Sequence, residues 1–127
     1  MGVAGETQPR NQNLIGNMRG FYPFSAQKVA TDSAGNYTTT TSYGSVGALN
    51  DVYGVAVDMG AGTIAFYKNN VSLGTAFSDL NSIGVNLTPA LLADSNSTGS
   101  GWVNYGQQPF TYTPPSGYVA LNTANLP

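Results

Sequence analysis

The sequence predicts an all-β protein, built as an antiparallel β-sandwich of the jelly-roll type, and three observations predict it. Short apolar runs alternate with turn residues at the spacing typical of sandwich strands. Gly, Asn, Thr and Ser make up 53 of the 127 residues, a balance poor in helix formers and rich in turn-forming and β-branched residues. Eight Tyr, five Phe and one Trp are spread along the chain and supply a core, which low-complexity disorder would lack.

The best-patterned part of the chain predicts a meander of three strands. Its strands alternate apolar and polar residues, and the first places Tyr53, Val55 and Val57 on one face. A Gly-rich turn separates the first two strands. Asn69 and Asn70 form the second turn, because Asn tolerates the positive φ of a tight hairpin better than most residues. The predicted strands are 51–58, 63–67 and 71–77.

Further strands are predicted on either side of the meander. Residues 37–43 are β-prone with one polar face, and residues 86–93 are apolar enough for a buried strand. Residues 102–105 form a short strand. Residues 21–24 are interrupted by Pro23, which favours a sheet edge or a bend.

The two ends of the chain differ from this pattern. Residues 1–15 are polar and show no structural period, so we expect a polar arm or linker there and a sandwich domain over 16–127. Residues 107–115 are too rich in Pro for a central strand and are expected to lie extended over the sandwich. Residues 117–121 add a last strand or cover an edge.

Composition excludes several classes of function. Only 8% of the residues are charged, the net charge is −2 and there are four basic residues, so we expect neither nucleic-acid binding nor attraction to anionic membranes. No apolar run approaches the length of a membrane helix, so no membrane insertion is expected. Cys and His are absent, which excludes disulfides, zinc thiolates and a Ser-His-Asp triad. We expect no cofactor and no metal.

The acidic residues predict turns rather than catalysis. Glu6 is the only Glu and lies in the predicted arm. A hydrolase would need two Asp to converge, but the Asp residues fall at strand ends or in turns, where Asp commonly accepts backbone hydrogen bonds. The protein is therefore predicted to be non-enzymatic, with an Asp-dependent hydrolase as a remote alternative. The five Asp are Asp32, Asp51, Asp58, Asp79 and Asp94.

Several motifs, in the right order, resemble SPRY domains. The segment DVYGVAVDMGAGTIAFYKNNVSLGTAF resembles the family's "V-G-V-x-x-D", "G-x-I-x-F-Y-K-N-G" and "G-x-A-F". LTPALLA resembles "L-Y-P-A-V", and WVNYGQQPFTYTPP resembles "V-x-x-N-F-G-x-x-P-F" with its extension. The ending GYVALNTANLP resembles the variety common in phage tail and appendage proteins.

Two departures from the SPRY pattern affect the expected fold. Asn70 replaces the Gly of the "K-N-G" turn. The family's early strands, of the "W-Y-W-E-V" and "I-G-V" type, are largely missing, and only residues 14–16 resemble a remnant. A sandwich without these strands has a gap and unpaired edges. Three explanations stay open: the arm contributes strands, a partner chain completes the sheet by strand addition, or the fold is truncated.

The resemblance implies a non-enzymatic structural or adhesion module of a bacteriophage, in a tail fibre, an appendage or a capsid decoration. Such a module is located in the virion and contacts other virion proteins or copies of itself. The alternative is a host-ligand recognition domain that binds surface carbohydrate or protein, because SPRY domains grip partners with loops at one end of the sandwich.

The candidate partner or ligand contacts come from strands and turns. Trp102 and Asn104 point outward if Val103 and Tyr105 take the family's inward positions. Trp102 then either packs under the Pro-rich extension or anchors an interface, and both readings stay open. A plain loop is favoured over a calcium site at Asp94 and Asn96, because only one carboxylate lies there. The full set is Trp102, Asn104, Tyr37, Tyr43, Asn70, Asp94 and Asn96.

Overall fold

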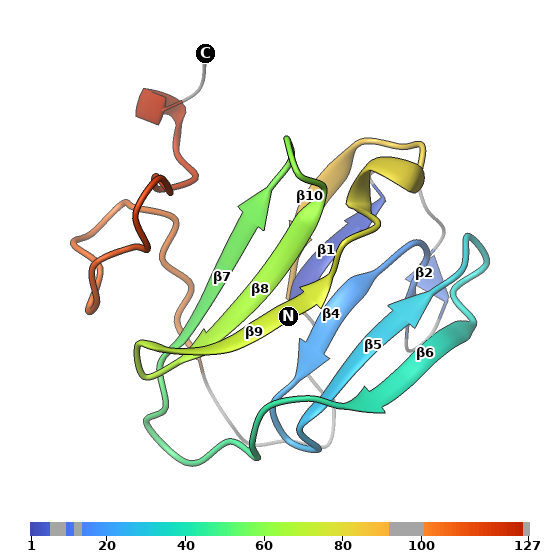
Figure 1. Ribbon diagram of the computed structural model, residues 1–127, viewed down its shortest axis with the longest axis horizontal. Coiled ribbons are helices and arrows are strands. Elements are labelled where there is room, and N and C mark those ends of the chain that lie inside the picture. The colour runs from blue at the N-terminus through green and yellow to red at the C-terminus, as the bar shows by residue number, and fades with distance from the viewer. Residues whose placement is uncertain (6–9, 12–13, 92–100, 126–127) are drawn as a thin grey trace. The chain divides into compact units, whose positions relative to one another are not determined.

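The computed structural model describes residues 1–5, 10–11, 14–91 and 101–125 (Figure 1). The chain divides into two compact units, Met1–Leu92 and Ala93–Pro127. All strands among the described residues lie in the first unit, in a five-stranded and a three-stranded antiparallel sheet and one short hairpin, so the predicted all-β sandwich is confirmed. Helical structure among the described residues is confined to two 3-10 turns of three residues each, so none of it is long enough to cross a membrane.

The larger sheet has five strands in the order β10-β1-β4-β5-β6, and the smaller has three in the order β7-β8-β9. A further pair, β2 (Arg10–Asn11) and β3 (Leu14–Ile15), forms a short hairpin. The strands of the larger sheet are β1 (Gly2–Gly5), β4 (Arg19–Tyr22), β5 (Gln27–Thr31), β6 (Tyr37–Ser42) and β10 (Leu87–Ala90). Those of the smaller are β7 (Tyr53–Asp58), β8 (Thr63–Lys68) and β9 (Val71–Phe77).

The predicted meander is the smaller sheet, and its register follows the sequence pattern. β7 pairs with β8 without interruption from Tyr53 opposite Lys68 to Asp58 opposite Thr63. Asn69 and Asn70 turn the chain into β9 with φ of 49° and 69°, so the positive φ expected of this turn is confirmed. Both central residues of a tight hairpin need this conformation, and Asn reaches it at low cost.

The core lies between the two sheets. Phe21 on β4 and Ile64 and Phe66 on β8 are fully buried. The rings of Phe21 and Phe66 lie 5.5 Å apart between centroids, in a tilted arrangement that favours aromatic pairs. The other buried members of this cluster are Val3 on β1, Ala76 on β9 and Leu80 in the 3-10 turn η1 (Leu80–Ser82).

The N-terminal residues differ from the expected arm. Gly2–Gly5 is β1, an interior strand between β10 and β4, and the Met1 carbonyl accepts a hydrogen bond from Phe21 N–H at 2.7 Å. A Cβ at Gly2 would lie 2.1 Å from the Arg19 carbonyl oxygen, so only Gly permits this approach. The strand is four residues long with two Gly, and its buried Val3 alone is too little to produce a visible period.

The gap expected from the missing early strands is therefore filled within the chain. β1, β4, β5 and β6 occupy that region as a continuous sheet. The chain turns at Pro23, which is one of the two outcomes expected there: β4 ends at Tyr22 and lies inside the sheet, so the bend is observed and the sheet edge is not. The buried strand predicted at 86–93 was wrong. β10 is an edge strand with exposed Thr88 and Pro89, not a buried one.

The second unit contains no strand among its described residues 101–125. The strand predicted at 102–105 is absent there, because side chains take the backbone partners that a ladder would use. Of the two alternatives for 117–121, the strand is not formed. Asn104 accepts a hydrogen bond from Gly106 N–H at 2.8 Å and donates to the Gln108 carbonyl at 3.1 Å. Gln107 accepts from Tyr105 N–H at 2.6 Å. The unit ends its described part in η2 (Thr123–Asn125).

Candidate protein-binding end of the sandwich

Three connections lie at one end of the sandwich, at the bottom of the view in Figure 1. They are the β4–β5 turn, the β6–β7 loop and the β8–β9 turn. Antiparallel pairing brings them together, because β4, β6 and β8 all finish at this end. We call this region the loop end, and it comprises residues 23–26, 44–52 and 68–71.

Backbone hydrogen bonds tie the long loop to its neighbours. Gly47 N–H donates to the Pro23 carbonyl at 2.8 Å, which joins the loop to the β4–β5 turn. The Lys68 ammonium donates to the Val46 carbonyl at 2.7 Å, which joins it to the end of β8. A Cβ at Gly47 would lie 2.6 Å from the Tyr53 hydroxyl, so the loop packs closely on the start of β7.

A polar cluster of Asp51, Lys68 and Asn69 supports the same loop. The Asp51 carboxylate accepts hydrogen bonds from Ala48 N–H at 2.6 Å and from the Asn69 amide at 2.7 Å, and it pairs with the Lys68 ammonium at 3.1 Å. These hydrogen bonds, assisted by the Lys68 charge, lower the pKa of Asp51 to about 2. Asn69 also exchanges two hydrogen bonds with the Val52 backbone. These contacts therefore hold the loop in one defined conformation.

On this framework the loop end exposes apolar side chains. Phe24 and Leu49 are each 91% exposed, and Val71 and Val46 are 65% and 59% exposed. Single exposed apolar residues are common on protein surfaces, but several on connected loops at one end mark an interaction site. Sequence reasoning missed all four. The available signal was the presence of Val46 and Leu49 in a predicted loop that shows no strand alternation.

Tyr43, a predicted contact, lies beneath the loop end and has a structural position. Its ring packs edge-on against Phe21 with centroids 5.5 Å apart. Its hydroxyl donates to the Gly74 carbonyl and accepts from Phe66 N–H at 3.3 Å. The β8–β9 register shifts at this point, so the Tyr43 hydroxyl supplies the partner that the ladder does not give to Phe66.

The other predicted contacts are scattered. Asn70 is exposed in the β8–β9 turn and belongs to the loop end. Tyr37 is 51% exposed on β6, where its hydroxyl lies 3.2 Å from that of Tyr22 and shares a hydrogen bond with it. Trp102 is fully exposed, so neither Phe110 nor Tyr112 covers it within its unit, and Asn104 organises the loop around it. Asp94 and Asn96 lie outside the described residues.

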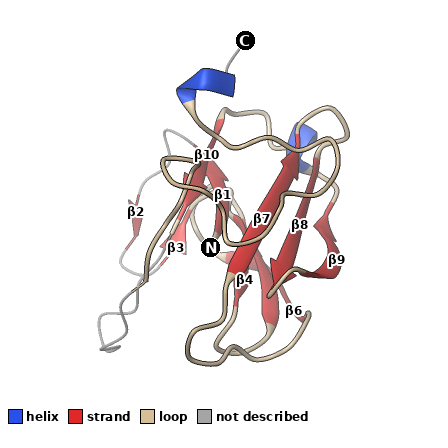
Figure 2. Cartoon of the chain, turned by 90° about the vertical axis from the view of Figure 1, so that its left-hand side faces the viewer, coloured by secondary structure: helices blue, strands red, loops and turns tan. Residues whose placement is uncertain are grey.

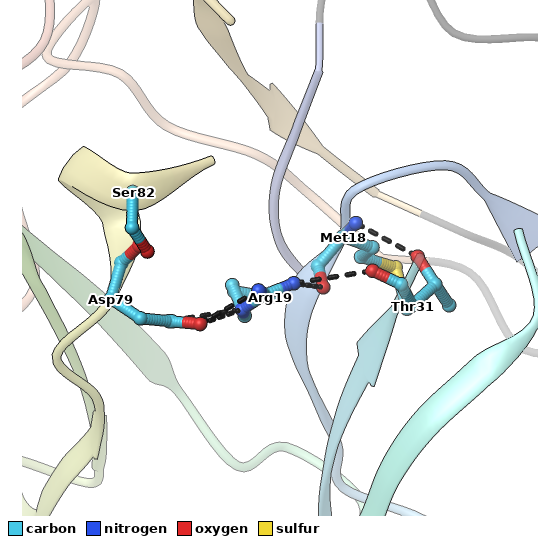
Figure 3. Close-up of polar contacts among 5 residues, drawn as sticks. All are labelled: Met18, Arg19, Thr31, Asp79 and Ser82. Carbon is cyan, nitrogen blue, oxygen red and sulfur yellow. Dashed lines mark hydrogen bonds and ion pairs between the residues drawn. The ribbon is translucent and has the colours of Figure 1, made fainter. Parts of the chain in front are cut away.

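The described aspartates all accept hydrogen bonds from other parts of the chain. Asp32 accepts hydrogen bonds from the backbone of Ala34 and Asn36, and Asp58 accepts one from Ala61 N–H at 2.9 Å. Asp79 accepts a forked pair from the Arg19 guanidinium, whose hydrogen bonds hold the pKa of that carboxyl below its usual value (Figure 3). Asp32 and Asp58 thus have the turn function that the sequence predicted for Asp, whereas Asp79 joins distant parts of the chain.

Comparisons with known proteins agree with this architecture. The SPRY domain model matches residues 1–108, so the match includes the strands that were expected to be missing. The E3 ubiquitin-protein ligase RKP of Arabidopsis thaliana is 30% identical over 116 residues, which are 90% of this chain and 8% of that protein. The chain thus spans less than a tenth of this relative's length. No solved structure matches. Since the family model covers most of the chain, the protein belongs to the SPRY domain family, whose members in general are protein-interaction modules.

Proposed function

We propose that this chain is a non-enzymatic binding module that contacts a partner protein through the loop end. The observation that carries the proposal is the exposure of Phe24 and Leu49 on loops that internal hydrogen bonds hold in place. Burying apolar surface contributes roughly 25 cal/mol per Å². A loop that is already ordered loses little conformational entropy when it binds, so more of this contribution remains as affinity.

The charges of the loop end indicate the chemistry of the partner. Its described charged residues are Asp51 and Lys68, and they neutralise each other in an ion pair whose side chains are 10% and 19% exposed. The surface offered to a partner is therefore apolar and amide-rich. A matching partner presents an uncharged apolar segment, and the affinity should change little with salt because few charges are screened.

A library of random peptides displayed on a carrier tests this surface. Peptides selected on the wild-type chain should be rich in apolar residues, and the double variant Phe24→Ser/Leu49→Ser should weaken their binding by about tenfold or more. Thr40→Ala, on the exposed edge strand β6, is the matched control and should leave binding unchanged. Selected peptides that bind the double variant as tightly as the wild type would exclude the loop end.

We further propose that the module is a structural or adhesion component of a phage particle, in a tail fibre, appendage or capsid decoration. Two features support this setting. The ending GYVALNTANLP resembles the phage variety of the family, and the surface relies on Gly, Asn, Ser and Thr rather than on charge. An immunoblot of density-purified particles from the source culture tests it, and finding the chain only in the soluble fraction would contradict it.

One observation favours a second candidate, recognition of a host carbohydrate. Tyr37 stands half-exposed on β6 among the exposed hydroxyls of Thr38 and Thr40. An exposed aromatic ring on a polar strand suits stacking against a sugar. Screening a glycan array with wild type and Tyr37→Ala separates this role from the loop end, since a sugar contact should disappear in Tyr37→Ala and persist in Phe24→Ser/Leu49→Ser.

A further inference from the structure

The four outer edges of the two sheets differ in how well they could pair with another strand. β10 carries Pro89, which has no N–H to donate. β9 has two register irregularities and Gly74 at φ 88°. β6 is polar, and its pairing with β5 shifts register near its start. β7 alone among these four combines uninterrupted pairing along its whole length with the absence of Pro, so its free side is a regular row of backbone donors and acceptors.

β7 also carries a core-facing side chain that remains partly exposed to solvent. Val55 lies opposite Phe66 in the register, so its side chain is on the core face of the sheet. Phe66 is fully buried, whereas Val55 is 45% exposed. The difference arises because β8 is the central strand, flanked by β7 and β9, whereas β7 is an edge strand with no described strand beyond it.

The second layer is open on the same side. Cross-sheet contacts run in order, from Lys28 on β5 with Ala76 on β9 to Phe21 on β4 with Phe66 on β8. This order places β7 opposite β1 and β10 (Figure 2). Leu91 directly follows β10 and continues the core-facing series of Leu87 by the period of two, yet it is 56% exposed. The sandwich is thus unfinished along its β7–β10 side.

We propose that a second copy of this chain covers that side, with β7 of one copy pairing antiparallel to β7 of the other about a two-fold axis. Side chains directly opposite each other lie on the same face of a sheet, so the two cores share a face when Val55 is opposite Val55 or Val57 of the second copy. Either register joins the two small sheets into one and buries Val55 against an apolar residue.

The charge pattern of β7 permits this self-pairing. Asp58 is its only charged residue. In the two registers Asp58 lies opposite Gly54 or Val52 of the second copy, so no carboxylate meets another across the axis. A two-fold pairing in which like charges were directly opposite would be destabilised. The remaining β7 residues are apolar, aromatic or Gly, and none obstructs close approach of a second strand.

Sedimentation velocity of the full chain across a range of concentrations tests the proposal. We expect a monomer–dimer equilibrium with a Kd on the order of 10 μM, which Val55→Lys shifts upward by about tenfold or more. Val71→Lys is the matched control, because it places the same charge on an exposed valine at the loop end and should leave the dimer intact. Phe24→Ser/Leu49→Ser should also remain dimeric, which separates this proposal from loss of partner binding.

Cysteine cross-linking keeps the test decisive if Val55→Lys fails to fold. The chain has no Cys, so each introduced thiol is unique. Under mild oxidation Val55→Cys should form a covalent dimer, or should cross-link with Val57→Cys if the second register holds. Thr40→Cys, on the β6 edge, is the control and should cross-link at least about tenfold more slowly. A wild-type chain that stays monomeric at the highest concentration reached, or that cross-links through β6 instead, would overturn the proposal.

Discussion

The two long sides of the sandwich are built differently. On the β9 side, polar side chains from the large sheet reach across to the small one. Arg19 pairs with Asp79 (Figure 3). Lys28 donates to the Ala76 carbonyl at 2.8 Å, and Tyr43 bonds to Gly74. On the β7 side, core-facing Val55 stays 45% exposed. The chain thus closes one side by itself and leaves the other suited to a partner.

The largest loss of stability is expected from removing the Tyr43 side chain, which contacts both sheets on the β9 side. Tyr43→Ala removes a ring packed on Phe21 and a hydroxyl that satisfies Phe66 N–H. We expect the free energy of unfolding to fall by about 3–5 kcal/mol, the range for deleting a large side chain in contact with the core. Urea unfolding, followed by far-ultraviolet circular dichroism, measures this loss of stability.

Tyr43→Phe separates the hydroxyl from the ring and should cost about 1–3 kcal/mol, because it leaves Phe66 N–H without that partner. Tyr37→Phe removes a hydroxyl at an exposed site and serves as the control, with an expected change below about 0.5 kcal/mol. Equal effects of the two Tyr→Phe changes would show that the Tyr43 hydroxyl does not complete the β8–β9 ladder.

The Arg19–Asp79 pair is expected to have the next largest effect. Arg19 donates to both Asp79 oxygens and, through its other terminal nitrogen, to the carbonyls of Met18 and Thr31. Its side chain is only 13% exposed, against 45% for Asp79. Arg19→Gln should therefore cost about 1–3 kcal/mol, because it removes the charged hydrogen bonds to Asp79 and to the two backbone carbonyls.

Asp79→Asn keeps the shape of the partner and those carbonyl contacts. It should cost less than Arg19→Gln, because an ion pair with one well-exposed member contributes little in water. Denaturant midpoints of the two variants and of the double variant form a cycle. A double variant that loses the sum of both single effects would show that the two side chains do not interact.

The features of the fold and of the candidate site that the sequence predicted are those that depend on residues close together along the chain. The meander was predictable because alternation and Asn69-Asn70 act within a few residues. β1 was not, because its two Gly carry no side chain to show a period and its fit depends on Arg19, seventeen residues further on. The Arg19–Asp79 pair spans sixty residues and leaves no local pattern. Exposed Phe24 and Leu49 follow no period either, so these two members of the loop end emerged only from the structure, whereas Asn70 was expected from the sequence.

Acid should weaken the β9 side and the loop end together. The pKa of Asp79 is lowered by its hydrogen bonds to Arg19, and that of Asp51 is lowered to about 2 by Ala48, Asn69 and Lys68. An unfolded Asp titrates near about 3.9. Each carboxylate therefore contributes its stability above that value and loses it as the pH falls through the lower folded pKa. The unfolding midpoint should drop between about pH 4 and pH 2, and Asp79→Asn should flatten part of this drop. A midpoint that does not change over this range would contradict the assigned hydrogen bonds.

The smallest expected effect is the most direct comparison of an open and a closed site. Val55→Thr and Val29→Thr make the same chemical change, but Val55 is 45% exposed and Val29 is fully buried on β5. A hydroxyl at position 55 keeps contact with water, so the monomer should lose less than about 0.5 kcal/mol. At position 29 the hydroxyl loses its hydration, and the cost should be about 1–3 kcal/mol. Both are measured by urea unfolding at protein concentrations low enough to keep the chain monomeric. If Val55→Thr cost as much as Val29→Thr in the monomer, the β7 side would already be covered by the chain itself, and no second copy would be needed to close it.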